Sequence, residues 1–349
     1  MKIRSQTVDL LKGFAVILMI QVHILELFAN QKIFNSHIGK VLLFLGGPPV
    51  APVFVLLMGY YIAASKKTNK QLLVRALAIF ALGMLLNLLL NFNLIISVCR
   101  GLYQINLWPY IFGVDILQFA GISIFLIVIL KKILEINFFL PIGLLGISAF
   151  LGHFLLNYIP DSVTLQYITS FFYGSSSWSY FPLFPWLAYP LAGFAFYQIR
   201  QKYKMNFLDT IKSKIICIVL FAAFVIFTIH YAISVSSHLQ AYYHHGPLFE
   251  TWVIVFLLFY FFFTNQLMLL TKNGPLLRYL KWLGKNVTLI YVIQWIITGN
   301  IATEIFRTVS SPLYLVMAFA GILAGSSLIA FLILKLKKKL QHLKPVGLQ

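Results

Sequence analysis

The chain has 349 residues, of which 60% are hydrophobic and 10% are charged, with 27 Lys and Arg against 8 Asp and Glu. Soluble domains average roughly 45–50% apolar and about 25% charged residues, so this composition excludes a soluble globular enzyme and a disordered chain. Two cysteines, Cys99 and Cys217, are too few for a disulfide scaffold. A formal charge of +19 is typical of nucleic-acid-binding proteins. Here, however, the basic residues lie in short clusters between long apolar runs, which indicates a polytopic membrane protein with no nucleic-acid partner.

Apolar runs long enough to cross a bilayer recur along the whole chain. Backbone amides have no hydrogen-bonding partner in lipid, so each such run is expected to be helical. The sequence therefore predicts an all-α bundle of about ten transmembrane helices, organised as one domain over residues 1–349. The expected spans are 6–29, 41–64, 72–92, 112–131, 138–157, 183–200, 213–234, 249–270, 286–303 and 312–335.

The basic residues are distributed unequally over the loops between these spans. Twenty-two Lys and Arg fall on one side, while only Lys32, Lys40, Arg100 and Arg307 fall on the other. Cytoplasmic loops carry the excess of positive charge. We therefore expect both termini in the cytoplasm of a multi-pass protein of the cell membrane, in a bacterium the inner membrane.

The first span carries four ionisable residues, Asp9, Lys12, His23 and Glu26. Ionisable groups within a membrane helix are costly and are functional candidates by default. Asp9, Lys12 and His23 share one face of the helix, and eleven residues separate Lys12 from His23, about 16 Å along the axis. Such a stripe is expected to face a protein interior or an aqueous cavity.

His23 suits a general base, because an imidazole is neutral near pH 7 and accepts a proton readily. Asp9 and Lys12 are three residues apart and can form an ion pair, which lowers the cost of burying both. The alternative is a structural triad that fixes helix packing, with His23 bonded to a carbonyl group.

Residues 4–23, RSQTVDLLKGFAVILMIQVH, resemble the opening of transmembrane acyltransferases. Lys12, ten residues and then His23 fit the pattern of acyltransferase family 3. Further segments are similar to the heparan-α-glucosaminide N-acetyltransferase-like family. They are PVFVLLMGYYIA at 52–63, FGVDILQFAGIS at 112–123, YFPLFPWLAYPLAG at 180–193 and LGKNVTLIY at 283–291.

The resemblance implies roles for individual residues. His23 stands where the family has an active-site His or Asn, His37 stands near a second His implicated in acetyl transfer, and Gln118 stands at the Gln or His of the fourth helix. Two positions depart from the family pattern. Phe119 replaces a basic residue, and Gln294 stands where many relatives have His.

Other candidates come from the residues themselves. Asp115 and Gln118 are one turn apart and can bond a sugar hydroxyl or, alternatively, make a polar helix contact. Arg75, with the basic cluster at 66–70, can bind the phosphates of a nucleotide-bearing donor or, alternatively, anionic lipid. His244 and His245 are expected at the surface of an outer loop. Without nearby acidic or thiol ligands they make a poor metal site, so no metal is expected.

These features together predict a membrane acyltransferase that moves an acyl group, we expect acetyl, from cytoplasmic acyl-CoA to a sugar or glycolipid of the cell envelope. His23, His37 and Asp9 are the catalytic candidates, Lys12 and Arg75 the donor-binding candidates, and Asp115 and Gln118 the acceptor-binding candidates. Membrane lipid is a further partner, and homo-oligomers are left open. The alternatives are a transporter or flippase for a lipid-linked saccharide, and a relative that binds without catalysis.

Overall fold

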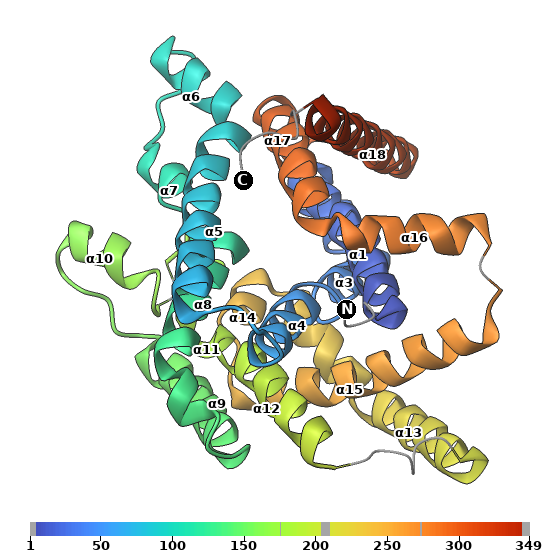
Figure 1. Ribbon diagram of the computed structural model, residues 1–349. Helices are drawn as coiled ribbons and strands as arrows, with labels where there is room; N and C mark the ends of the chain where they lie inside the picture. Colours follow the sequence, from blue (N-terminus) through green and yellow to red (C-terminus); the bar gives the residue numbers. More distant parts are fainter. Residues whose placement is uncertain (1–4, 175, 204–209, 273, 344–349) are drawn as a thin grey trace.

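The computed structural model describes residues 5–174, 176–203, 210–272 and 274–343, and these residues form helices joined by short loops (Figure 1). Two isolated bridges, Ala29 with Val309 and Val114 with Ser179, stand in place of a sheet in this described part. The helices are α1 (Gln6–Phe28), α2 (Gln31–Phe34), α3 (His37–Gly46), α4 (Ala51–Ala63), α5 (Asn69–Leu90), α6 (Phe92–Cys99), α7 (Trp108–Ile111), α8 (Ile116–Leu134), α9 (Phe139–Leu155), α10 (Val163–Thr169), α11 (Leu183–Trp186), α12 (Ala188–Lys202), α13 (Ile211–Ser236), α14 (Leu239–Tyr243), α15 (Pro247–Leu270), α16 (Pro275–Lys285), α17 (Val287–Ile305) and α18 (Pro312–Leu343).

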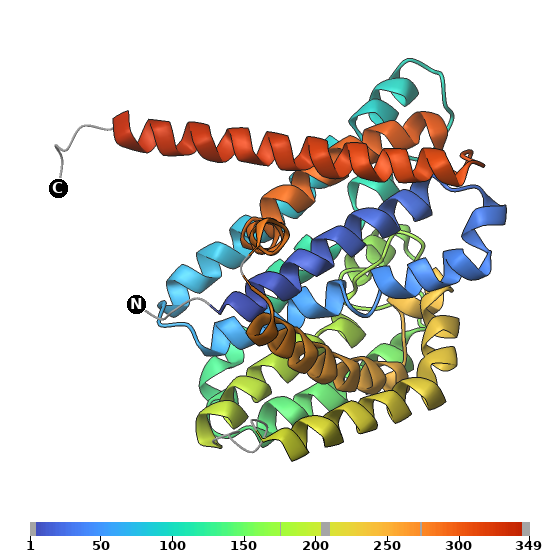
Figure 2. The same ribbon diagram turned by 90° about the vertical axis from the view of Figure 1, so that its right-hand side faces the viewer.

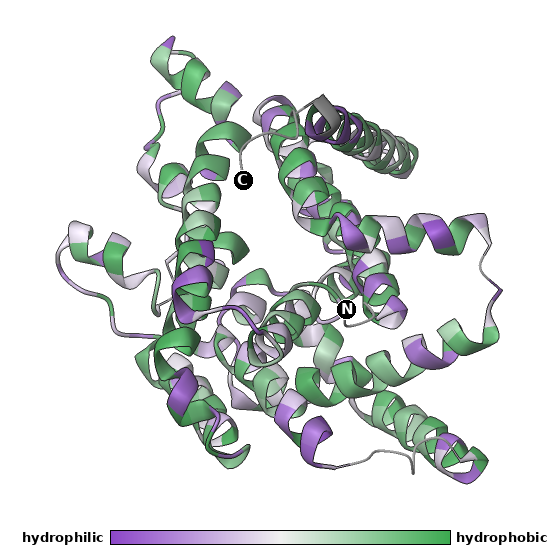
Figure 3. Cartoon of the chain, in the orientation of Figure 1, coloured by the Kyte–Doolittle hydropathy of each residue, from purple (hydrophilic) through white to green (hydrophobic). Residues whose placement is uncertain are grey.

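The fold is that of an all-α polytopic membrane protein, as the sequence predicts. Eight segments of the described residues are long and apolar enough to cross a bilayer: α1, α3 together with α4, α5, α8, α13, α15, α17 and α18. The other two expected spans, 138–157 and 183–200, correspond to the shorter helices α9 and α12. Hydrophobic residues predominate along the long helices, as the hydropathy colouring shows (Figure 3), and many of their large side chains are exposed. Phe227 and Leu270, for example, are each 83% exposed.

The span expected at 41–64 is interrupted. The helix α3 ends at Gly46, α4 begins at Ala51, and the residues between them are Gly47, Pro48, Pro49 and Val50. Proline has no amide hydrogen and clashes with the preceding turn, so two successive prolines end a helix. Gly46 lies so close to Val22 of α1 that a β-carbon there would overlap the valine side chain.

Two large hydrophobic cores and one small cluster hold the described helices together. The first core is formed mainly by α4, α5, α8, α11, α12 and α15, the second by α1, α16, α17 and α18, and the small cluster by α1, α2 and α3. Small residues allow close crossings within them, as is common between membrane helices. Gly59 of α4 approaches the carbonyl of Pro190 in α12, and Gly284 of α16 approaches the carbonyl of Asp9 in α1. Figure 2 shows α1 running between α18 and the helices of the first core.

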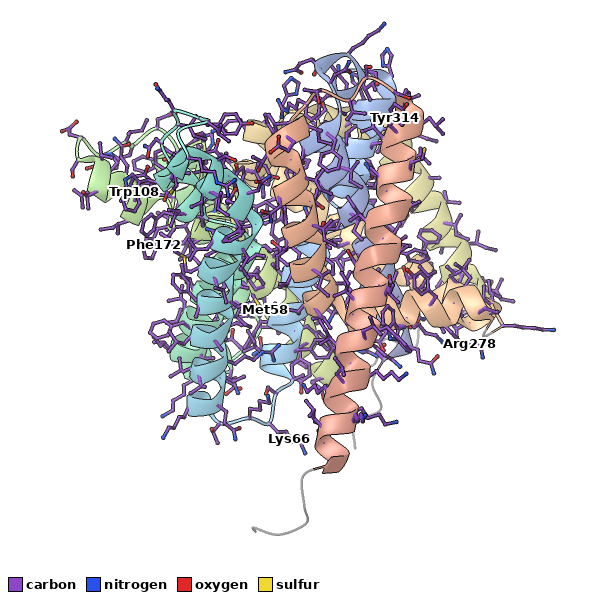
Figure 4. The ribbon with its side chains drawn as sticks, turned by 90° about the horizontal axis from the view of Figure 1, so that it is seen from above. Met58, Lys66, Trp108, Phe172, Arg278 and Tyr314 are labelled. Atoms are coloured by element: carbon purple, nitrogen blue, oxygen red, sulfur yellow. The ribbon has the colours of Figure 1, made fainter. Side chains whose placement is uncertain are left out.

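The loops alternate between the two ends of the bundle. In the view of Figure 4, Lys66 lies at one end, whereas Trp108 and Tyr314 lie at the other, and Arg278 lies between them. The separation of Lys66 from Trp108 follows the alternation of loops expected from charge. In the following, the Lys66 end and the Trp108 end denote these two ends of the bundle.

Candidate active site

A cavity of about 440 Å³ lies toward the Trp108 end, where the two cores meet. The chain supplies its wall from segments far apart in sequence, including α1, the start of α4, the end of α5, the start of α8, α14 and α17. The interruption between α3 and α4 contributes Gly46, Gly47 and Val50. Polar side chains gather in the wall, namely His23, Glu26, Asn87, Asn91, Tyr110, Asp115, Tyr180, Ser236, Tyr242, Tyr243, Tyr291, Trp295 and Thr303.

His23 of α1 lines this cavity and is held by α17. Its Nδ1 lies 3.1 Å from Oε1 of Gln294, and its ring lies over Trp295 with centroids 4.0 Å apart. The amide nitrogen of Gln294 donates to the carbonyl of Tyr291, so the amide oxygen is the atom that accepts from His23. Nδ1 therefore carries the hydrogen, and Nε2 is the ring nitrogen with a lone pair. This tautomer suits a general base that must accept a proton.

Asp115 lines the same cavity from the N-terminus of α8. Its carboxylate accepts a hydrogen bond of 2.7 Å from the Tyr291 hydroxyl and another of 2.7 Å from the backbone amide of Ile116. Aspartate is a favoured helix-capping residue because its oxygens satisfy amides that have no partner within the helix. One helix, α17, thus fixes both His23, through Gln294, and Asp115, through Tyr291.

Glu26 is a cavity residue to which the sequence analysis gave no role. It lies three residues beyond His23, so the two side chains share one face of α1. Arg307 closes the end of α1 beside it. The Arg307 amide donates to the carbonyl of Leu27, its Nε donates to the carbonyl of Glu26, and its guanidinium lies 4.9 Å from the Phe34 ring centroid. The i+3 spacing from His23 is the sequence signal that could have identified Glu26.

Acidic side chains occur in the cavity wall of a chain that is basic as a whole. Glu26 and Asp115 are among the described lining residues, and Lys and Arg are absent from them, although the formal charge of the chain is +19. Two carboxyl groups favour a cationic or neutral guest and disfavour phosphate or sulfate groups.

The rest of the predicted stripe lies outside the cavity. Asp9 is buried where α1 meets Gly284 of α16, and Lys12 lies with its Nζ 5.4 Å from the ring centroid of Tyr61. His37 is exposed at the first turn of α3 and is not part of the described lining. Of the three catalytic candidates, only His23 reaches the cavity.

Arg75 and Gln118 are also outside the described lining. Arg75 is exposed on the first half of α5. Gln118 is fully buried. Its Oε1 accepts from the backbone amide of Asp115, and its side chain packs against Gly83 of α5. Gln118 thus holds the helix end that carries Asp115. The adjacent Phe119 is fully buried in the first core.

The expectation that His244 and His245 lie at the surface is wrong. Their exposed fractions are 8% and 2%. Burial lowers the pKa of each imidazole to about 4, an effect opposed by a hydrogen bond to the backbone of Ser179 for His244 and of Tyr242 for His245. The His245 ring packs against those of Trp186, Tyr189 and Phe249, and a partner as distant in sequence as Trp186 leaves no local sequence signal.

Comparison with known proteins gives a family. Residues 4–222 match the family model described as heparan-alpha-glucosaminide N-acetyltransferase, catalytic. The match covers more than half of the chain and includes His23, Glu26 and Asp115. Curated proteins and solved structures gave no significant match.

Proposed function

The chain belongs to the heparan-α-glucosaminide N-acetyltransferase catalytic family of membrane acetyltransferases, and from this premise we propose that it transfers an acetyl group from acetyl-CoA to the amine of an envelope sugar at the His23 cavity. The observation that carries this proposal is the geometry of His23. Its Nδ1 is held by Gln294 while the ring faces a cavity that also contains two carboxyl groups.

The proposed step uses His23 as the base. The amine nitrogen of the acceptor attacks the thioester carbonyl carbon, so a carbon–nitrogen bond forms and the carbon–sulfur bond breaks. His23 Nε2 takes the proton that the amine loses and delivers it to the departing thiolate. A route through acetyl-His23 uses the same nitrogen as nucleophile and remains open.

An amine is the acceptor that this cavity favours. An amino sugar enters as an ammonium ion, which Glu26 and Asp115 attract, and it must pass one proton to a cavity carboxylate or to water before it can attack, so that His23 takes only the second proton, the one lost during transfer. The tyrosine hydroxyls and amide groups in the wall suit the hydroxyls of a sugar ring. A sugar bearing sulfate or phosphate would meet two carboxyl groups without a lining Lys or Arg, so we expect it to bind poorly.

The nucleotide of the donor belongs at the Lys66 end in this proposal. Phosphates need cationic partners at short range, and the described lining of the cavity has none. Lys66 marks this end of the bundle in Figure 4, Lys12 lies in the first half of α1 and Arg75 in the first turns of α5, whereas His23 lies in the second half of α1. The acetyl end of the donor then reaches the cavity from the cytoplasmic side, while the acceptor enters from the outer side.

The test is acetyl transfer by the purified protein in detergent. Labelled acetyl-CoA is mixed with glucosamine or with N-acetylglucosamine, whose nitrogen is already blocked. We expect label on glucosamine alone, and a loss of about 10²–10⁴-fold in rate for His23→Ala. His37→Ala is the matched control and should retain the parent rate.

Three results would contradict the proposal. Label on N-acetylglucosamine would indicate transfer to a hydroxyl group. A rate of acetyl transfer by His23→Ala equal to that of the parent protein would show that His23 is not the base. Absence of transfer, combined with movement of a labelled lipid-linked saccharide across reconstituted vesicles, would favour the transporter.

A further inference from the structure

The helix α14 places two consecutive tyrosines in the cavity wall. It is a single short helix that ends at Tyr243, and both Tyr242 and Tyr243 line the cavity. The last carbonyl groups of any helix lack partners within the helix. The carbonyls of Tyr242 and Tyr243 therefore need donors from elsewhere, and those donors decide where the two side chains lie.

Two buried ring nitrogens supply these hydrogen bonds. Nε1 of Trp186, a fully buried residue of α11, donates to the Tyr243 carbonyl at 2.7 Å. Nδ1 of His245 donates to the Tyr242 carbonyl at 2.7 Å. The two rings pack edge to face with centroids 5.1 Å apart. Both donors are thus held in one rigid aromatic cluster.

Tyr189 of α12 sets the tautomer of His245. Because Nδ1 of His245 donates to the Tyr242 carbonyl, its Nε2 has the lone pair and accepts from the Tyr189 hydroxyl, 2.8 Å away. Tyr189 is fully buried. The hydrogen-bonded chain therefore runs from the start of α12 through His245 to the end of α14.

Tyr242 presents a polar atom that has no hydrogen-bond partner among the described residues. The side chain is 5% exposed, lines the cavity, and its hydroxyl is unpartnered there. A buried polar group without a partner is destabilising, and a wall residue in this state is suited to bond a guest. Tyr243 packs its ring edge against Tyr180 and Phe181, which also line the cavity.

We propose that Trp186 and His245 are positioning residues that hold Tyr242 and Tyr243 as an acceptor-binding wall opposite His23. The proposal rests on the proposed function, because it assigns the acceptor to this cavity. The acceptor-binding wall is a further part of the site, built by residues 184–186 (Phe-Pro-Trp) together with residues 242–245. The Tyr242 hydroxyl bonds the sugar, and the two ring nitrogens fix its place.

The experiment measures acceptor binding and kinetics separately. Trp186→Phe keeps an aromatic ring and removes the indole donor to Tyr243, together with part of the ring volume. We expect about a tenfold rise in the glucosamine KM, the loss typical of one hydrogen bond, with kcat and the acetyl-CoA KM within twofold of the parent. Tyr242→Phe should give a similar rise. In the double variant the rise in the glucosamine KM should be smaller than the product of the two single rises, since both residues act through the same wall of the cavity.

Trp178→Phe is the matched control, because the Trp178 indole nitrogen has no hydrogen-bond partner among the described residues and Trp178 is not a lining residue. It should leave the glucosamine KM unchanged. Calorimetric binding of glucosamine without donor gives a readout independent of turnover. Parent-like binding by both Trp186→Phe and Tyr242→Phe would overturn the proposal, whereas absence of transfer by the parent protein would overturn the proposed function instead.

Discussion

His23 has an amide as its partner where hydrolytic triads have a carboxylate. Gln294 can fix the tautomer and the ring orientation, because it accepts from Nδ1 and is itself anchored on the Tyr291 carbonyl. It cannot neutralise an imidazolium. The nearby carboxyl group of Glu26, on the same face of α1, is the group that can offset the positive charge once His23 has taken a proton. Gln294 thus orients the His23 ring.

Replacing Gln294 by Leu should lower kcat by about 10- to 100-fold, because Nδ1–H loses its acceptor and the ring loses its fixed orientation, in the range seen when orienting partners of functional histidines are removed. The acetyl-CoA KM should stay near the parent value. Steady-state kinetics on glucosamine measure both. Gln201→Leu, at an exposed glutamine near the end of α12, is the control, and an equal loss in both variants would argue against orientation as the cause.

The buried histidines should make stability depend on pH. A free histidine titrates near pH 6.5, whereas burial lowers the pKa of His244 to about 4. Between these values the unfolded chain binds a proton that the folded chain does not, so folding stability falls as the pH drops from 6.5 to 4 and is fully present above 6.5. The slope is at most about 1.4 kcal/mol per pH unit for each histidine.

Thermal denaturation in detergent across this pH range should therefore show a flatter slope for His244→Asn than for the parent. His37→Asn, which changes an exposed histidine, should leave the slope unaltered. A slope in His244→Asn as steep as that of the parent would show that His244 titrates normally in the folded protein.

The sequence predicted part of the site and missed the rest for a geometric reason. Helical periodicity predicts Asp9, Lys12 and His23 on one face, but the fourteen residues from Asp9 to His23 span about 21 Å along the axis. A stripe of that length crosses the membrane, so only its far end reaches the cavity. The partners of His23 and Asp115 lie 271 and 176 residues away in the chain, and one sequence without relatives holds no signal for such pairings.

At the scale of elements, the interrupted segment formed by α3 and α4 shapes the site. A continuous helix from His37 to Ala63 would carry side chains where Gly46, Gly47 and Val50 now form wall. The prolines end α3, and Gly46 lets it lie directly on Val22, one residue before His23. Residues 46–52, GGPPVAP, end α3 through the local chemistry of proline, whereas the helix that packs against this interruption is decided by contacts distant in sequence.

Gly46→Ala should lower the thermal stability of the protein, since the added methyl group overlaps the Val22 side chain and overpacking typically costs about 1–3 kcal/mol. Combining it with Val22→Ala should recover part of the loss, because the smaller side chain makes room. Denaturation of the two single variants and the double variant gives the coupling. A strictly additive result would mean that the two residues do not compete for the same space.

For the whole molecule, the distribution of Lys and Arg is the sequence feature that best predicts which end faces the cytoplasm. Composition and apolar run length identified the eight described segments that are long and apolar enough to cross a bilayer, because the bilayer sets helix length, while the other two expected spans correspond to the shorter helices α9 and α12. The same reasoning missed the division into two cores and the lateral helix α16, which arise from contacts between distant segments. The assignment of the Lys66 end to the cytoplasm rests on the excess of Lys and Arg in its loops and stays a prediction.

The native cysteines can test this orientation. Cys99 is exposed at the end of α6, and Cys217 lies near the start of α13. In intact cells a membrane-impermeant thiol reagent should label the parent through Cys99 and should not label Cys99→Ala. Adding Lys67→Cys to Cys99→Ala should give labelling only after the cells are opened. Labelling of Lys67→Cys in intact cells would reverse the topology and place the donor on the outer side.

The long separation between the partners in the site has a consequence during synthesis. A ribosome adding about 5–20 residues per second needs roughly 15 to 55 seconds to pass from His23 to Gln294, 271 residues later. Through that interval the polar groups of α1 and the carboxylate of Asp115 reside in the membrane without α17. A nascent chain that stalls before α17 therefore exposes the same uncompensated groups that the finished enzyme needs, and membrane quality control can distinguish the incomplete product by them.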